Sequence, residues 1–177
     1  MTVYTVVRRE GDAPEARMRA RTCALAQLLP RLGVPEDVRV EKDGAGRPYF
    51  PDHPALFISI SHAPRLTAMA VSHRPVGVDL ECSARIRDPE GIARRFFTED
   101  ERAALPDPLT SDAVCRVWTR KEALGKYDGR GLGATVSIST QNPPDDASFY
   151  TEIFTDDGVR YCLTLCTHFP PTRDDAD

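Results

Sequence analysis

Two acidic residues lie two positions apart at the end of an apolar run. They are Asp79 and Glu81, in the stretch 75–81 with the sequence Pro-Val-Gly-Val-Asp-Leu-Glu. In a β-strand, residues i and i+2 project from the same face, so the two carboxylates would lie side by side. Adjacent carboxylates repel each other unless a positive charge lies between them. The pair therefore indicates either a cation-binding site or a strand end that opens into solvent, where two acids cost little.

A third carboxylate and a lysine occur in segment 113–127, for which the sequence predicts the longest helix. Glu122 and Lys126 are one turn apart on the same face, which is common for exposed ion pairs worth about 0.3–0.5 kcal/mol. Trp118 lies one turn before Glu122 and favours partial burial of that face. If the helix packs beside the acidic strand, three carboxylates form an oxygen-rich site of the kind that binds Mg²⁺.

The segments before the acidic strand predict a strand, a helix and then a meander of strands. Strands are expected at 2–7, 38–42, 57–61 and 66–72, with a turn at 63–65 that joins the last two. A helix over 15–32 should end at Gly33, because glycine adopts the left-handed conformation that often stops a helix. Its expected apolar side comprises Met18, Cys23, Leu25, Leu28, Leu29 and Leu32. The same helix carries Arg17, Arg19 and Arg21, which form either a solvated face or an anion-binding cluster.

After the acidic strand, the pattern becomes helical and then returns to strands. Helices are expected at 89–97, after the capping box at 98–101, and at 113–127. Strands are expected at 135–139, 148–155 and 159–167. The order of elements predicts the α+β class with two similar halves, residues 1–74 and residues 75–177, that meet at the acidic strand.

Composition limits the classes of function. The chain has 177 residues and a formal net charge of −4, so general binding to nucleic acid or to a membrane surface is not expected. The five cysteines are scattered and odd in number, which does not indicate a disulfide framework or a zinc site. Neither a signal peptide nor an apolar run of membrane-spanning length is visible, and a cytoplasmic location is expected.

Four ordered motifs resemble those of the 4′-phosphopantetheinyl transferases, and in particular the Sfp-type (surfactin-synthetase-activating) branch. The two main motifs are Gly-Val-Asp-Leu-Glu at 77–81 and Trp-Thr-Arg-Lys-Glu-Ala-Leu-Gly-Lys at 118–126. The upstream motifs are Gly-Arg-Pro-Tyr-Phe at 46–50 and Ile-Ser-Ile-Ser-His at 58–62. Segments 96–98 and 129–132 also match the family's pattern around the long helix. Four motifs in order are a far stronger signal than any one of them.

The resemblance implies a transfer reaction. The 4′-phosphopantetheine group of coenzyme A would move to a serine hydroxyl of an acyl or peptidyl carrier protein, with release of adenosine 3′,5′-bisphosphate. Mg²⁺ would be the cofactor, with Mn²⁺ as an alternative. The family's fold is two pseudo-symmetric halves, each a small antiparallel sheet packed against a long helix, with the active site in the cleft between them. Such a cleft lies within one chain, so a monomer is expected.

The resemblance also implies roles for individual residues. The expected metal ligands are Asp79, Glu81 and Glu122, and the expected catalytic residues are Glu122, as the base for the serine proton, and Lys126. The expected coenzyme A-binding residues are Arg21, Arg47, Pro48, Ser61, His62, Asp79 and Lys126. Residues 1–74 would thus bind the coenzyme A phosphates, and residues 75–177 would carry the metal site and the catalytic helix.

Two residues depart from the family's pattern. Ala63 follows His62 where many relatives have a small polar residue. Gly125 lies inside the long helix, where glycine costs about 1 kcal/mol relative to alanine. It would either loosen the turn that carries Lys126 or allow another segment to approach closely.

Other readings of the sequence remain open. A carrier protein presents an acidic helix, and Arg94, Arg95, Phe96, Phe97, Arg116 and Arg120 could form a platform for it, or could be core and solvated residues. A non-catalytic coenzyme A or carrier-binding module should have lost metal ligands or Lys126, and none is lost. A small metal-dependent phosphohydrolase lacks an evident group to position water.

Overall fold

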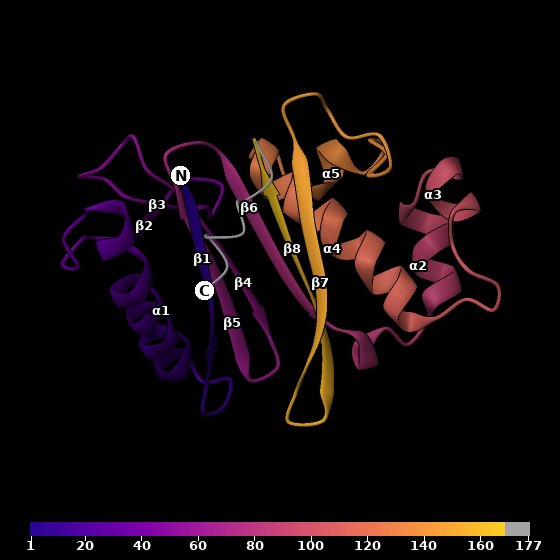
Figure 1. Cartoon of the computed structure of the whole chain (residues 1–177), viewed down its shortest axis with the longest axis horizontal. Helices are drawn as coiled ribbons and strands as arrows, with labels where there is room; N and C mark the ends of the chain where they lie inside the picture. The colour runs from indigo at the N-terminus through magenta and orange to yellow at the C-terminus, as the bar shows by residue number, and fades with distance from the viewer. Residues whose placement is uncertain (169–177) are drawn as a thin grey trace.

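Two three-stranded antiparallel sheets pack face to face in the computed structural model, which describes residues 1–168 (Figure 1). The N-terminal sheet has the order β1-β5-β4, and the C-terminal sheet has the order β6-β8-β7. The strands are β1 (Thr2–Arg8), β4 (Phe57–Ala63), β5 (Leu66–Ser72), β6 (Val76–Cys82), β7 (Ser148–Asp156) and β8 (Val159–Thr167). The predicted α+β class with small antiparallel sheets is confirmed.

One long helix covers the outer face of each sheet (Figure 1). Helix α1 (Pro14–Leu28) lies on the N-terminal sheet, and α4 (Ser111–Asp128) lies on the C-terminal sheet. The smaller elements are β2 (Glu41–Lys42), β3 (Pro48–Tyr49), α2 (Pro89–Phe96), α3 (Glu99–Ala103), α5 (Leu132–Thr135) and short 3-10 helices at Pro30–Leu32 and Ser83–Arg85. No helix within residues 1–168 combines the length and the apolar character that a membrane crossing requires.

Side chains alternate along β6, so one face of the strand lies in the core between the sheets and the other faces α4. Val78 and Leu80 point into the apolar core between the sheets, where Leu163 and Leu165 of β8 meet them. The intervening residues face α4. A Cβ atom on Gly77 would lie 1.9 Å from the Ala123 carbonyl oxygen, so only glycine permits this contact between strand and helix. The sequence thereby brings α4 directly against the strand that carries the two acids.

The ends of α4 are defined by local chemistry. The helix starts after Thr110, whose Oγ1 accepts a hydrogen bond from the Ala113 amide at 3.2 Å. It ends at Gly129, which has φ +80°. Gly125 does not mark a loose turn: a Cβ atom there would lie 2.8 Å from the Leu132 amide nitrogen. The glycine therefore lets α5 approach the helix closely, the second of the two alternatives.

The strand predicted at 135–139 is wrong. This segment leaves α5 and forms turns, although Val136 and Ile138 alternate as in a strand. Their carbonyl oxygens accept hydrogen bonds from Lys121 Nζ at 2.8 and 2.9 Å. Because a buried lysine takes these acceptors, they are not available for a ladder with a neighbouring strand.

The expected apolar side of the first helix is also partly wrong. Met18 is 60% exposed and Cys23 is exposed. The buried side of α1 consists instead of Ala16, Ala20, Ala24, Leu25 and Leu28. Small residues at four-residue spacing let the helix approach the sheet closely, which the size of the side chains does not indicate. The helix ends at Leu28, and a 3-10 turn leads to Gly33, which has the expected left-handed φ of +67°.

Two further expectations need correction. Only Glu41 and Lys42 of the strand expected at 38–42 form a strand, which pairs with β3 (Pro48–Tyr49). Phe97 is 4% exposed and packs with Val114 and Val117, so it belongs to the core and not to a docking platform. The hairpin between β4 and β5 is confirmed, with Arg65 in the left-handed region at φ +62°.

Candidate active site

The buried carboxylate of Asp79 is the centre of the site. Its Oδ1 accepts hydrogen bonds from Lys126 Nζ at 2.8 Å and from Ser61 Oγ at 2.9 Å. Lys126 Nζ also donates to the Val78 carbonyl oxygen at 2.9 Å. Three predicted site residues, on β4, β6 and α4, therefore meet at one point although they are far apart in the sequence.

Three carboxylates lie close enough to affect one another. Burial and repulsion by Asp79 raise the pKa of Glu81 from its ordinary value of 4.5 to about 7. Burial and the Asp79 charge also raise the pKa of Glu122, and the nearby Lys126 charge opposes this shift. One lysine thus faces three acids, and the site has room for additional positive charge.

The donor atoms suit a hard cation only in part. Asp79 Oδ2 is buried and has no hydrogen-bond partner among the described residues, which leaves a carboxylate oxygen for a cation. Within residues 1–168, however, no three His, Cys, Asp or Glu side chains form a group that could hold a metal ion as they stand. The orphaned oxygen and the mutual repulsion of the acids fit a cation, and Glu81 and Glu122 would have to move to enclose it.

His62 faces away from this carboxylate centre. Successive strand residues alternate, so Ser61 contacts Asp79 while His62 lies on the α1 side of the sheet. The Nδ1 atom of its ring is 2.9 Å from Thr67 Oγ1. Partial burial, together with the charges of Arg9 and Arg17, lowers the pKa of His62 from 6.5 to about 4. The surroundings are thus positive and would attract an anion.

Sequence reasoning missed Arg9 and Lys42 near His62, and it named Arg17 only as a member of the arginine cluster on the first helix. Arg17 acts on it from α1, one turn before the predicted Arg21. Lys42 also contributes, from the short β2 strand. The four-residue spacing of the alanines on α1 could have indicated which arginines flank the sheet, because it fixes the buried face of the helix.

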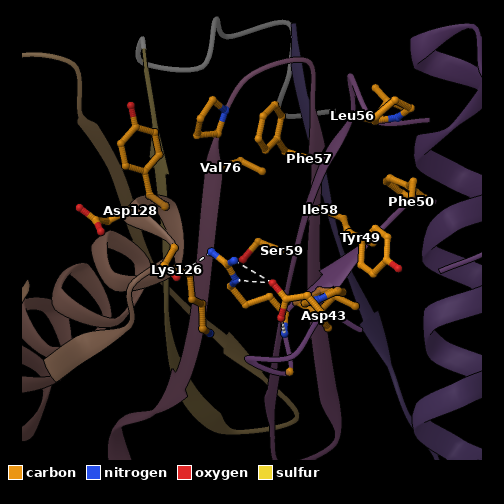
Figure 2. Close-up of a pocket in the computed structure, with 18 of the residues that line it drawn as sticks. Asp43, Tyr49, Phe50, Leu56, Phe57, Ile58, Ser59, Val76, Lys126 and Asp128 are labelled. Atoms are coloured by element: carbon orange, nitrogen blue, oxygen red, sulfur yellow. Dashed lines mark hydrogen bonds and ion pairs between the residues drawn. The ribbon is translucent and has the colours of Figure 1, made fainter. Parts of the chain in front are cut away.

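A cavity of about 670 Å³ opens beside Lys126, between the loop around Arg47 and the end of α4. Figure 2 shows Lys126 and Asp128 on one side of it and Tyr49 and Phe50 on the other. Pro48, Phe57 and Ser59 also line it. A volume of this order is typical of pockets for small organic ligands.

Arg47 bridges two segments at this cavity. Its Nη1 donates to the Gly129 carbonyl oxygen at 2.7 Å, and its Nε donates to Asp43 Oδ2 at 2.8 Å. The guanidinium group therefore lies at the C-terminal end of α4, where the helix dipole favours a positive charge. A phosphate role for Arg47 would require it to exchange these partners.

Comparison with known proteins places the chain among relatives of one kind. A family model described as the 4′-phosphopantetheinyl transferase superfamily matches residues 75–172. The 4′-phosphopantetheinyl transferase HetI of Nostoc sp. is 33% identical over 123 residues, which are 65% of this chain and 52% of HetI. The transferase Sfp of Bacillus subtilis is 28% identical over 154 residues, 78% of this chain and 67% of Sfp.

A third relative extends the comparison. The transferase AcpT of Salmonella typhimurium is 30% identical over 140 residues, which cover 75% of this chain and 71% of AcpT. The match spans only about half the length of HetI, and an equal share of a second Bacillus subtilis transferase. The family model nevertheless includes the strand of Asp79 and the whole of α4. The chain belongs to the 4′-phosphopantetheinyl transferase superfamily.

Proposed function

We propose that this protein transfers the 4′-phosphopantetheine group of coenzyme A to a serine hydroxyl of an acyl or peptidyl carrier protein. The observation that carries the proposal is the junction at Asp79, where Ser61 and Lys126 bind one carboxylate beside Glu81 and Glu122. Family membership supports the same reaction class. Transfer of a phosphoryl-type group depends mainly on positioning and on stabilisation of charge, which this arrangement can supply.

The three acids are the proposed metal ligands. Asp79, through its unpartnered Oδ2, with Glu81 and Glu122, would hold Mg²⁺, or Mn²⁺ in its place. The bound ion would neutralise charge on the pyrophosphate oxygens. Ionisation of Glu81 above its pKa of about 7 makes the acid set a better binding site as the pH rises.

Residues from both the N-terminal and the C-terminal half would bind coenzyme A. His62, with the positive charges of Arg9 and Arg17 behind it, suits a phosphate monoester. Lys126 would contact the pyrophosphate, because its ammonium group already lies at Asp79 Oδ1. The cavity lined by Pro48 and Tyr49 is large enough for a nucleoside-sized group. Arg21 and Arg47 are also proposed to bind coenzyme A.

The bonds in the reaction balance as a simple displacement. The carrier serine Oγ forms a bond to the phosphorus that bears pantetheine, and the bridging P–O bond of the pyrophosphate breaks. Adenosine 3′,5′-bisphosphate leaves with the electron pair. Glu122 accepts the serine proton, directly or through water.

The carrier would dock near α2. Arg94 and Arg95 are exposed on this helix, and the Phe96 ring packs edge-on against Trp118 at a centroid distance of 5.1 Å. Exposed guanidinium groups beside half-buried aromatic rings suit the acidic helix of a carrier protein.

The test is conversion of an apo carrier to its holo form, measured as a gain in mass. We expect a gain with the parent protein, Mg²⁺ and coenzyme A, and none with Asp79→Ala or Glu122→Gln variants that melt like the parent. No gain with a panel of acyl and peptidyl carriers would refute the proposal. Binding of coenzyme A without turnover would indicate a binding module, and cleavage of coenzyme A without a carrier would indicate a hydrolase.

A further inference from the structure

Helix α4 carries a lysine that the proposed reaction does not use. Lys121 and Glu101 of α3 are both fully buried, and their Nζ and Oε2 atoms are 2.8 Å apart. Lys121 Nζ also donates to the carbonyl oxygens of Val136 and Ile138 at 2.8 and 2.9 Å. All three protons of the ammonium group are therefore used.

The acidic partner is equally well satisfied. Glu101 Oε2 also accepts a hydrogen bond from the Thr98 amide at 2.8 Å. Its Oε1 accepts two from Thr140, from the amide at 2.7 Å and from Oγ1 at 2.8 Å. Burial alone would raise the pKa of Glu101, but the bonds from Lys121, Thr140 and Thr98 outweigh it and lower the pKa. These bonds therefore stabilise the charged form of Glu101.

Stability does not explain why this pair is charged. Apolar side chains of similar volume usually replace a buried ion pair without loss of stability, and often with a gain. An ion pair with several hydrogen bonds differs in being directional. Here those bonds join three segments: the start of α3, the turns at 136–140 and the middle of α4. They therefore restrict rotation and sliding of α4 in a way that apolar contacts do not.

Lys121 lies close in sequence to the two proposed catalytic residues of α4. Lys121 directly precedes Glu122 and lies about one and a half turns before Lys126. On the other side of α4, close contact with Gly77 sets the distance to the acidic strand, and Thr119 Oγ1 lies 2.8 Å from Thr164 Oγ1 of β8. We propose that Lys121 and Glu101 are positioning residues, which fix the rotation of α4 that presents Glu122 and Lys126 to Asp79. The inference rests on the proposed transfer reaction.

The decisive variant replaces both charges at once, Lys121→Met with Glu101→Leu. It should fold, because no charge is left buried and alone, but with a lower Tm, because the Thr98 and Thr140 amides and the carbonyl oxygens of Val136 and Ile138 lose their partners. Its kcat for carrier modification should fall about tenfold or more, since small displacements of catalytic groups are costly. Its dissociation constant for Mn²⁺, measured on the free protein by electron paramagnetic resonance, should rise about fivefold or more, because Glu122 is displaced from the other acids.

A matched control lies on the same helix. Asp112 of α4 forms an exposed ion pair with Arg160 of β8, with Nη2 and Oδ2 2.6 Å apart. The pair Asp112→Asn with Arg160→Gln also removes two opposite charges, yet it should leave kcat and Mn²⁺ affinity within about twofold of the parent. A purely structural role for Lys121 predicts the same for the buried pair. A folded buried-pair variant with parental kcat and Mn²⁺ affinity overturns the inference.

The double variant could fail to fold, or the parent protein could fail to modify a carrier. If the double variant does not fold, Thr140→Val decides, because it removes one hydrogen bond to Glu101 and keeps both charges. A kcat lowered by about twofold or more at an unchanged Tm supports positioning, and an unchanged kcat and Mn²⁺ affinity refute it. If the parent itself modifies no carrier, the proposed function fails, and the Mn²⁺ measurement still tests the geometry.

Discussion

Individual site residues are held in states that isolated side chains would avoid. The Glu81 carboxyl group has a pKa of about 7, because it is half-buried and lies beside Asp79. A carboxyl group whose pKa is higher in the folded state binds its proton more tightly when folded. The contribution of Glu81 to stability should therefore be fully present below its ordinary pKa of 4.5 and should be lost as the pH rises through about 7.

The substitution Glu81→Gln tests whether ionisation of Glu81 beside Asp79 destabilises the fold. In metal-free buffer, its Tm should exceed that of the parent by roughly 2–4 °C at about pH 8, because the charge repelled by Asp79 is gone. At about pH 5 the two should melt together, since Glu81 is then mostly protonated. The exposed Glu36→Gln should change neither value. A variant that melts below the parent at the higher pH would show that Glu81 does not experience repulsion.

His62 gives a second prediction at this scale, with the opposite sign. Its pKa of about 4 lies below the ordinary 6.5, so the imidazole is neutral near pH 7. A phosphate group bound among His62, Arg9 and Arg17 would neutralise the positive surroundings and raise that pKa. NMR titration of the imidazole should show an upward shift of at least about one unit on addition of adenosine 3′,5′-bisphosphate. The His62→Gln spectrum identifies the signal, and an unmoved pKa with bound ligand would place the phosphate elsewhere.

Among the elements, the contact between β6 and α4 is the tightest constraint on the site. A Cβ atom at Gly77 would meet the Ala123 oxygen at 1.9 Å and the Tyr127 nitrogen at 2.7 Å, which are backbone atoms that cannot turn aside. Gly77→Ala should destabilise the fold by about 1–3 kcal/mol, because the helix must move away from the strand. The bond between Lys126 and Asp79 should then lengthen, and transfer should be lost.

Gly133 offers a matched substitution for that experiment. It lies in α5, and a Cβ atom there would meet nothing within 4 Å. Gly133→Ala should therefore be neutral or stabilising by up to about 1 kcal/mol. Chemical denaturation of both variants measures the difference. Equal effects would mean that the close contact at Gly77 is not what holds the helix in place.

The sequence allowed prediction of those elements whose structure is determined by their own residues. Gly77 to Glu81 was identifiable as a strand bearing two acids, and α4 as the helix that supplies Glu122 and Lys126. The segment 135–139 was predicted incorrectly because a residue elsewhere decides its state: Lys121 takes its carbonyl oxygens. Nothing in the motif distinguishes that buried lysine from an exposed one, and fully buried lysines are rare. Side-chain type thus predicts local structure better than it predicts partners.

For the whole molecule, the central fact is that both sheets share one core. Ala68 and Ala70 of β5 lie in the same apolar cluster as Val78 of β6 and Leu163 of β8. At one end of the sheets, the β7–β8 hairpin contacts both the β4–β5 turn and the end of β1. Arg65 Nη1 lies 2.6 Å from Asp157 Oδ2, and Tyr161 Oη donates to the Pro64 carbonyl oxygen at 2.8 Å. Arg8 of β1 forms an ion pair with Asp156. The site lies where the two sheets meet, since Ser61 and Asp79 belong to different sheets.

A shared core predicts how the halves behave when they are separated. Fragments 1–74 and 75–177, made as independent chains, should each fail to melt cooperatively, because each exposes the apolar face that the other covers. Mixing them should restore a cooperative transition and, with it, transfer to a carrier, because the bond between Ser61 and Asp79 can form only across the two fragments. Circular dichroism and the carrier mass assay follow the two recoveries. If each fragment melts cooperatively near the Tm of the full chain, the halves are independent domains and the core between the sheets contributes little. Recovery of the transition without activity would instead mean that the link Arg74-Pro75, which joins the sheets, is itself needed to align the two sides of the site.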